Sequence, residues 1–311
     1  MQICKRTFSS LLSLFFLLSL SFFILRALPG GPFDDQQALP QETKEKLKKV
    51  YDLHLPLHQQ YLLFLKNLSR GDFGPSLKYR DFSVRELILK GLPISLALAL
   101  SSLLFSLFLG IPLGILSVLR KDRWETQILS FLFNMGIALP NYVLAPLLSL
   151  LFSLHLKWLP VAGWENGNWR YLILPICSLS LAQIAHISRF VHSNLLSTLQ
   201  TPFVQAAIAN GIPLPRILYS HCFKPVLLPL ITYLTPTAAS LVTHSVSIER
   251  IFCLPGLGTF LIYGVLNRDY PLVLGMIFVF GCFISLGNFL VDLLYSFLNP
   301  QISFMQSSSS H

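Results

Sequence analysis

The sequence has few charged residues. They make up 12% of its 311 residues, whereas an ordinary globular protein has about 25%. Hydrophobic residues make up 53% of the chain, and the mean hydropathy is +0.61. A soluble domain of this length needs a charged surface that this composition does not supply. The sequence therefore predicts an all-α protein that crosses a membrane several times, because backbone polar groups in lipid must be satisfied within a helix or sheltered by protein.

Several kinds of functional motif are absent. The five cysteines are single and far apart, which indicates neither a paired metal site nor a disulfide framework. No phosphate-binding G-x-x-x-x-G-K-[ST] loop, H-E-x-x-H motif or G-x-S-x-G motif occurs. The net charge of +9 comes without an arginine-rich arm, which favours loops facing an acidic membrane surface over nucleic-acid binding. We expect no catalytic residue, no metal site and no cofactor bound by this chain.

Ionisable side chains are also sparse within the apolar runs. The candidates are His155, His186, His244 and Asp292. A charge at a helix centre costs about 3 kcal/mol on insertion scales, so proton-coupled pumps keep such charges only for function. We interpret each histidine as a packed or interfacial residue, which argues against a secondary transporter and for a passage protein whose energy comes from elsewhere.

Six uncharged runs are long enough to cross a bilayer, which takes about 20 apolar residues in a helix. We predict transmembrane helices over residues 7–27, 93–119, 127–153, 171–190, 225–248 and 271–295, the last five within a membrane core over 91–300. The other predicted segments are a cytoplasmic N-terminus (1–6), a folded extracytoplasmic segment (28–90), a cytoplasmic loop (191–224) and a disordered cytoplasmic tail (301–311). Residues 251–267 are apolar but broken by Pro255, Gly256 and Gly258, which predicts a re-entrant or interfacial segment.

The distribution of positive charges in short loops predicts the orientation. With both termini in the cytoplasm, the short inside segments carry eight Lys and Arg residues and the short outside loops carry four. The first run follows Lys5 and Arg6, as in a signal peptide, but no small-x-small cleavage site follows it. We therefore expect a retained first helix and both termini inside.

The extracytoplasmic segment has the pattern of a folded unit. Apolar residues at helical spacing predict helices over 41–53 and 55–68. Gly71, Gly74 and Pro75 then mark a turn. Residues 83–89 are predicted to form a short amphipathic helix that leads into the second span.

The cytoplasmic loop contains a helix–turn–helix pattern. Thr201 followed by Pro202 is typical of a helix start, and Gly211 of a helix end. Residues 212–215 predict a stiff turn before a second helix that leads into the fifth span. The small side chains of Ala206 and Ala207 let another surface approach closely. The pattern fits docking into a groove on a soluble partner, and it equally fits an ordinary connector between two spans.

Residues of this loop resemble a known motif. Gln205-Ala206-Ala207-x-x-x-Gly211, followed by His221 and Leu227-Leu228-Pro229, resembles the E-A-A-x-x-x-G loop of permease subunits in bacterial ABC importers. Further matching blocks run nearly end to end: 26–32 (RALPGGP), 70–77 (RGDFGPSL), 92–93 with 110–114, 158–160 with 163–164, 247–258 (SIERIFCLPGLG), 268–271, and 292–295 with 299–300. Together they resemble the dipeptide/oligopeptide permease family, and in particular its B-type subunit.

The resemblance implies a non-catalytic subunit of an ATP-driven importer of short peptides in the inner (plasma) membrane of a prokaryote. It implies four kinds of partner: a second permease that shares the pathway, two ABC ATPase subunits that use the ATP, an extracytoplasmic peptide-binding protein, and membrane lipid. The ATPase-coupling residues would be Gln205, Ala206, Ala207, Gly211 and His221, with the two alanines filling the ATPase groove. The extracytoplasmic mouth would contain Glu249, Pro255, Gly256 and Gly258. Glu249 and Arg250 equally fit a solvated charge pair that caps a span.

The sequence also departs from the family pattern. Gln205 stands where many permeases carry Glu, and Ile208 and Asn210 stand where relatives often carry basic residues. The same family includes importers of nickel, glutathione and antimicrobial peptides, so the cargo stays open. The competing classes are a secondary transporter, which would need intramembrane charges and often has repeated halves, and a membrane scaffold, which would need neither the loop nor the Pro-Gly-Leu-Gly segment.

Overall fold

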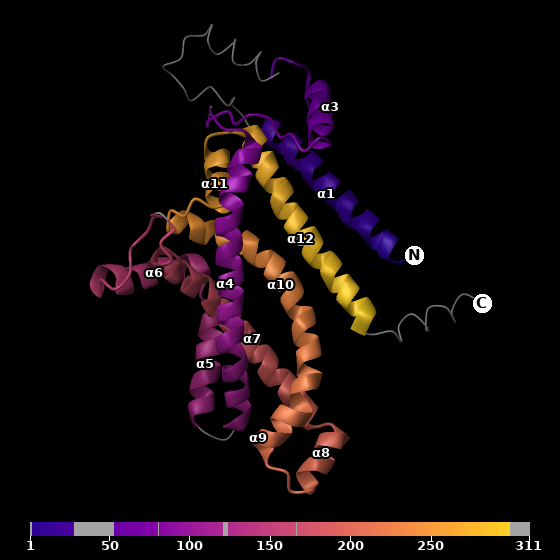
Figure 1. Cartoon of the computed structure of the whole chain (residues 1–311), viewed down its shortest axis with the longest axis vertical. Helices are drawn as coiled ribbons and strands as arrows, with labels where there is room; N and C mark the ends of the chain where they lie inside the picture. Colours follow the sequence, from indigo (N-terminus) through magenta and orange to yellow (C-terminus); the bar gives the residue numbers. More distant parts are fainter. Residues whose placement is uncertain (1, 28–52, 80, 121–123, 166, 299–311) are drawn as a thin grey trace, which may run out of the picture.

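The chain folds into a bundle of long helices. The computed structural model describes residues 2–27, 53–79, 81–120, 124–165 and 167–298 (Figure 1). The long helices are α1 (Gln2–Ala27), α4 (Val84–Leu119), α7 (Arg170–Leu199), α10 (Phe223–Ile251) and α12 (Tyr270–Leu298). The shorter elements are α3 (Leu57–Leu68), α5 (Trp124–Ala138), α6 (Asn141–Ser149), the π-helix η1 (Leu150–His155), α8 (Pro202–Ala209), α9 (Leu214–Ile217), the π-helix η2 (Leu218–Cys222) and α11 (Leu257–Leu266). The described residues contain one isolated bridge, between Pro75 and Ser83, and no strand, which confirms the all-α prediction.

Five helical stretches are long and apolar enough to cross a membrane: Thr7–Ala27, Val84–Leu119, Arg170–Leu199, Leu214–Ile251 and Tyr270–Val291. A sixth candidate consists of two helices, Thr126–Ala138 and Asn141–His155, which meet at an angle of 105°. The polytopic prediction is therefore confirmed.

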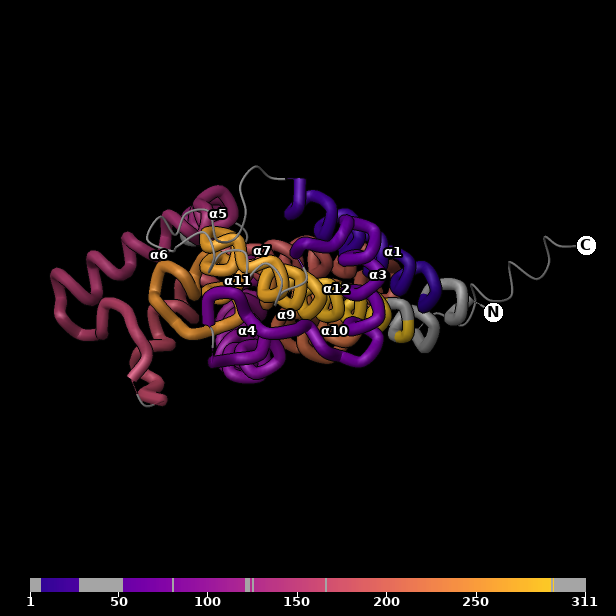
Figure 2. The backbone as a smooth tube through the Cα atoms, turned by 90° about the horizontal axis from the view of Figure 1, so that it is seen from above, coloured from indigo at the N-terminus to yellow at the C-terminus, as the bar shows by residue number. Residues whose placement is uncertain are grey.

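The third predicted span, over residues 127–153, is not one continuous helix. Pro140 lies at the bend; it has no N–H to donate, and it disfavours helical backbone at Leu139. α5 therefore ends at Ala138, and α6 starts in a new direction. Figures 1 and 2 show α6 and α1 on opposite sides of the bundle.

The bounds of other helices also differ from the predictions. Residues 83–89 are the start of the long helix α4, where Ser83 and Glu86 form a capping box, rather than a separate helix. α7 continues to Leu199, so the loop predicted from residue 191 begins only after it. Residues 214–251 form one helical stretch, so the fifth span has no boundary at residue 225.

Two features of the segment between α1 and α4, which was predicted to be extracytoplasmic, agree with the predictions. The helix predicted over 55–68 is α3, and Gly71 and Gly74 have φ values of +69° and +80° in the turn that follows. The helix predicted over 41–53 falls almost entirely, and the tail over 301–311 falls completely, outside the described residues.

Small residues allow α4 and α7 to pack closely. Gly110 and Gly114 of α4 lie against Ile187, Ser188 and Val191 of α7, and a Cβ atom on Gly114 would lie 2.7 Å from Ser188 O. Ser188 Oγ donates a hydrogen bond of 3.0 Å to Gly110 O. Lipid supplies no hydrophobic force between helices, so close backbone packing and hydrogen bonds of this kind hold membrane helices together.

The buried apolar residues form two clusters. One joins α4, α7, α10, α11 and α12 and includes Leu98, Leu179, Ile248, Leu257 and Leu272. The other joins α7, α8, α9 and α10 and includes Ile187, Leu195, Val204, Ile217 and Leu230. α11 lies at one end of the molecule, and α8 and α9 lie at the opposite end (Figure 1). The loop that carries α8 and the segment that leads into α11 are therefore each packed against a separate apolar cluster.

Candidate functional site

The first candidate region is the loop that carries α8. Thr201 has extended backbone angles, and Pro202 occupies the first turn of the helix, where its missing N–H is not needed. α8 ends at Ala209, and Gly211 has a φ of +77° while its N–H donates to Ile208 O at 2.9 Å. The start and end predicted for this helix are confirmed.

α8 has one inward face. Val204 and Ala207 are buried and pack within the cluster that includes Leu195 and Ile217. Phe203 is 52% exposed, and Ala206, one turn later, is also exposed. This corrects the expectation that Ala206 and Ala207 together fill a partner's groove, because Ala207 packs against its own chain. The outward apolar edge includes Phe203 and Ala206, and Ile208 is also exposed, at 42%.

Two other predicted coupling residues, Gln205 and His221, lie in different elements. Gln205 Nε2 donates a hydrogen bond of 2.7 Å to Leu199 O and so satisfies a carbonyl at the end of α7. His221 is half-buried in η2. The structure therefore brings Gln205, Ala206 and Gly211 into one compact loop and places His221 beyond α9, next to the start of α10.

The second candidate region surrounds Glu249, near the end of α10. Its side chain is fully buried. Ser245 Oγ donates to Glu249 Oε1 at 2.6 Å, and the Gly258 N–H donates to Oε2 at 2.7 Å. Arg250 instead packs its guanidinium 4.3 Å from the centre of the Tyr263 ring. The interpretation of Glu249 and Arg250 as a solvated charge pair is therefore wrong.

The two glycines of this region leave room for the carboxylate. A Cβ atom on Gly256 would overlap Glu249 Oε2, and one on Gly258 would overlap the backbone of Val246. Pro255, half-buried, precedes them in the turn between α10 and α11. Glu249, Pro255, Gly256 and Gly258, predicted as one group, do lie together, and they form a packed joint between α10 and α11.

Polar partners of this joint were missed in the sequence. Ser95 Oγ of α4 accepts a hydrogen bond of 2.9 Å from Leu257 N and so ties α11 to α4. Asp269, before α12, is fully buried and accepts hydrogen bonds from Ser76 Oγ and from Leu272 N. Ser95 and Leu257, and likewise Ser76 and Asp269, are distant along the chain, and no local pattern joins the members of either pair. An isolated Ser two residues after Pro93 or an Asp before a helix is too common to indicate such a contact.

Tyr79 lies in the turn beside Asp269. Burial raises the pKa of its phenol above the ordinary value, and the nearby Tyr263 and Asp269 add to that rise. The phenol therefore stays protonated at neutral pH, and it packs edge-on against the Phe260 ring of α11, 6.0 Å between centroids.

Comparison with known proteins decides the family. Residues 110–304 match the model of the family described as the binding-protein-dependent transport system inner membrane component. The chain belongs to this family. As a member of the family of binding-protein-dependent transport components, it is a multi-pass membrane component of a transport system. Both candidate regions, 201–221 and 249–258, lie within the matched residues.

Named relatives of this inner membrane component match along nearly the whole chain. The oligopeptide transport system permease protein OppB of Haemophilus influenzae is 41% identical over 303 residues, which is 97% of this chain and 99% of that protein. The dipeptide transport system permease protein DppB of Bacillus subtilis is 31% identical over 298 residues, which is 96% of each.

A solved structure supports the fold. A chain of the MetNI methionine ABC transporter, in a structure that describes inward-facing conformations, matches with a TM-score of 0.53 at 20% sequence identity. The match covers 68% of this chain and 97% of that one. At this identity the similarity concerns the architecture alone, and it agrees with the arrangement expected for the family.

Proposed function

We propose that the chain is the permease subunit of an ATP-driven, binding-protein-dependent importer of short peptides. The observation that carries the proposal is the similarity to oligopeptide and dipeptide permeases over 96–97% of the chain, which includes the loop around α8 and the joint around Glu249. The chain itself forms the pathway together with a second permease. Two separate ABC ATPase subunits hydrolyse the ATP.

The loop around α8 is the proposed docking site of the ATPase subunits. Phe203 and Ala206 give it an exposed apolar edge, while Val204 and Ala207 anchor it to the bundle. From Leu214 to Ile251 the chain is helical over 38 residues, which corresponds to about 57 Å. A movement of α8 is thus carried along α9, η2 and α10 toward the joint at Glu249.

The proposed orientation has α8 and both termini in the cytoplasm. α3 and α11, at the opposite end of the molecule (Figure 1), then face outward, where an extracytoplasmic peptide-binding protein delivers the cargo. The positive charges of the short loops support this orientation. Peptides are proposed over nickel or glutathione because the relatives matching nearly full length are named for oligopeptides and dipeptides.

Purification of the full chain from its own membranes in mild detergent tests this assembly. We expect a second permease and two ABC ATPase subunits to purify with it and to be identified by mass spectrometry. Phe203→Asp should release the ATPases but retain the second permease, because it places a charge on the apolar edge. Trp169→Asp is the matched control, since Trp169 is 68% exposed and lies just before α7, outside residues 201–221. A chain that purifies alone in several mild detergents would contradict the proposal.

A further inference from the structure

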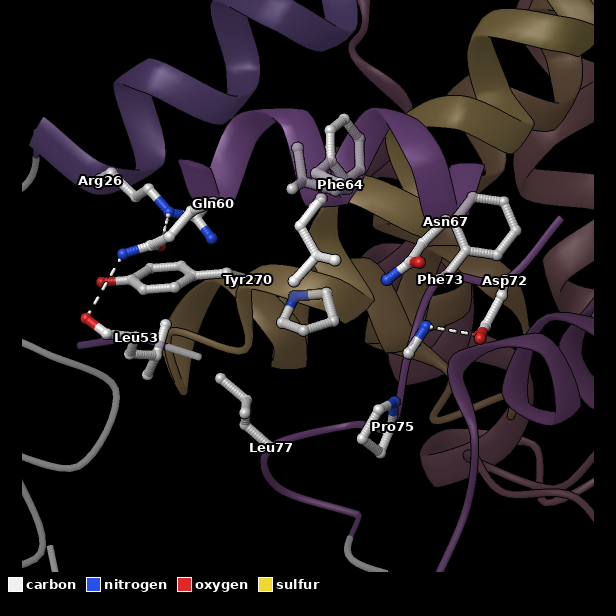
Figure 3. A pocket seen from close by; sticks show the side chains of 14 residues that line it. Arg26, Leu53, Gln60, Phe64, Asn67, Asp72, Phe73, Pro75, Leu77 and Tyr270 are labelled. Carbon is white, nitrogen blue, oxygen red and sulfur yellow. Dashed lines mark hydrogen bonds between the residues drawn. The ribbon is translucent and has the colours of Figure 1, made fainter. Parts of the chain in front are cut away.

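A pocket lies beside the C-terminal end of α1, and most of its lining residues precede the residues matched by the family model. Its walls are α1, α3, the turn after α3 and the start of α12 (Figure 3). Its volume is about 170 Å³, enough for on the order of ten water molecules. The walls are mostly apolar, and they include one guanidinium and one carboxylate, those of Arg26 and Asp72. Neither charge takes part in the α8 loop or the Glu249 joint.

Arg26 is held rigidly at one end of the pocket. Its Nε donates a hydrogen bond of 2.8 Å to Gln60 Oε1, and Gln60 Nε2 in turn donates to Leu55 O at 2.8 Å. The guanidinium carbon lies 3.8 Å from the centre of the Phe22 ring. Nη1 of Arg26 is buried and has no hydrogen-bond partner in the described part of the chain. A buried charged donor without a partner is costly, and a guanidinium pairs best with a carboxylate or phosphate.

Asp72 lies at the other end of the pocket. Its Oδ1 accepts a hydrogen bond of 2.9 Å from Gly74 N, which uses only part of its capacity as an acceptor. The side chain is exposed. In Figure 3, Arg26 and Asp72 stand at opposite sides of the view, with Phe64 and Pro75 between them. The pocket thus offers a cation at one end, an anion at the other and an apolar middle.

Both charged residues are attached to the helix α3. Arg26 is bonded to Gln60, and the N–H of Asp72 donates to Asn67 O at 3.0 Å. Gln60 and Asn67 lie on the same helix, seven positions apart in the sequence, which corresponds to about 10 Å. An extended chain advances about 3.3 Å per residue. The two attachment points on α3 are therefore separated by about the length of an extended peptide of three residues.

We infer that this pocket binds short zwitterionic peptides, with the C-terminal carboxylate at Arg26 and the N-terminal ammonium at Asp72. The class of ligand rests on the proposed function. The permease itself then carries a peptide site at its outer end, in addition to the site on the binding protein. Recognition of both chain ends with an apolar middle makes the site sensitive to peptide length and tolerant of side-chain identity.

Direct binding to the unaltered protein is the first test. The full chain, with the subunits that purify with it, is placed in lipid nanodiscs without ATP or binding protein, and radiolabelled trialanine is added in equilibrium dialysis. We expect saturable binding. C-terminal amidation of the peptide should weaken binding about ten- to a hundredfold, because it removes one charge-assisted interaction. N-terminal acetylation of the peptide should also weaken binding.

Two substitutions assign each end of the peptide. Arg26→Gln should abolish the preference for a free carboxylate, and Asp72→Asn should abolish the preference for a free ammonium. Asp72→Asn keeps the oxygen that accepts from Gly74 N, so the turn is retained. Arg70→Gln, at an exposed arginine of the same turn, is the matched control and should keep both preferences. A merely structural role of Arg26 would lower the amount of folded protein without separating amidated from free peptide.

Three results would overturn the inference. The first is that the wild-type complex shows no saturable binding of trialanine. The second is that amidation of the peptide does not change its affinity. The third is that a phospholipid is retained through Arg26 and is not displaced by trialanine. The last result would make the pocket a lipid headgroup site. ATP-driven uptake is measured separately. Peptide uptake without peptide binding in this pocket refutes this inference alone. Peptide binding in this pocket without peptide uptake by the assembled importer refutes the proposed function.

Discussion

Glu249 stabilises the α11 end of the molecule as an acceptor of hydrogen bonds. Both of its oxygens are used, one by a side chain of its own helix and one by the backbone at the start of α11. Its backbone carbonyl also accepts from Leu254 N at 2.9 Å. Because the side chain is fully buried, water cannot replace a bond that is lost. A single residue thus fixes the angle at which α11 leaves α10.

Glu249→Met should lower the free energy of unfolding by about 1–3 kcal/mol. Methionine has a similar unbranched shape but no carboxylate oxygen, so the buried N–H of Gly258 loses the acceptor that it has at Glu249 Oε2. The measurement is the thermal transition of the detergent-purified chain. Asp81→Asn, at an exposed carboxylate, is the control and should leave the transition unchanged. Equal transitions for both variants would contradict the role given to Glu249.

Gly256→Ala should also destabilise the fold, by about 1–3 kcal/mol. Gly256 has a φ of −96°, which alanine adopts freely, so the effect comes from the overlap of its Cβ with the Glu249 carboxylate and, less severely, with Ser95 Oγ. A shorter carboxylate should relieve that overlap. Gly256→Ala combined with Glu249→Asp should therefore lose less stability than the two single changes added together. Additive losses would mean that the two residues do not meet.

At the scale of elements, the loop around α8 depends on the left-handed backbone of Gly211. Gly167, in the loop before α7, has nearly the same φ, +75° against +77°, and neither position has an atom within 4 Å of an added Cβ. A substitution therefore costs similar backbone strain at either site, about 1–2 kcal/mol. The two glycines separate local strain from a role in coupling.

Gly211→Val should uncouple ATP hydrolysis from transport, while Gly167→Val should not. Valine at residue 211 displaces Ile212 and the proline turn, and with them the position of α8 relative to α9. The measurement is the stimulation of ATPase activity by loaded binding protein, compared at equal amounts of assembled complex. Equal stimulation in the two variants would count against the coupling role of the loop.

Local sequence signals predicted the starts and ends of several elements. Thr201-Pro202, Gly211 and the Gly71–Gly74 turn act through their own backbone preferences, and the structure has them as predicted. The bend at Pro140 was missed because the uncharged run continues through it, and charge alone does not locate a proline break. The burial of Glu249 was missed because it depends on how the start of α11, with Gly258, and α4, with Ser95, pack at the end of α10. Contacts of that kind depend on packing between elements.

At the scale of the whole molecule, the two candidate regions lie at opposite ends and share α10. One core fixes α8 at one end, and the other core fixes α11 at the opposite end. The helical stretch over 214–251 connects them without a loop. The design suits a protein in which a movement made on one side of a membrane has its effect on the other side.

The most direct test of this account is ATP-driven uptake of a peptide. The chain and its copurifying subunits are reconstituted into vesicles with the matching binding protein, and entry of a radiolabelled tripeptide is measured. The account predicts uptake that requires both ATP and binding protein, continues when a proton gradient is dissipated, and falls to background in Gly211→Val but not in Gly167→Val. Uptake that does not require ATP but stops when the proton gradient is dissipated would contradict this account.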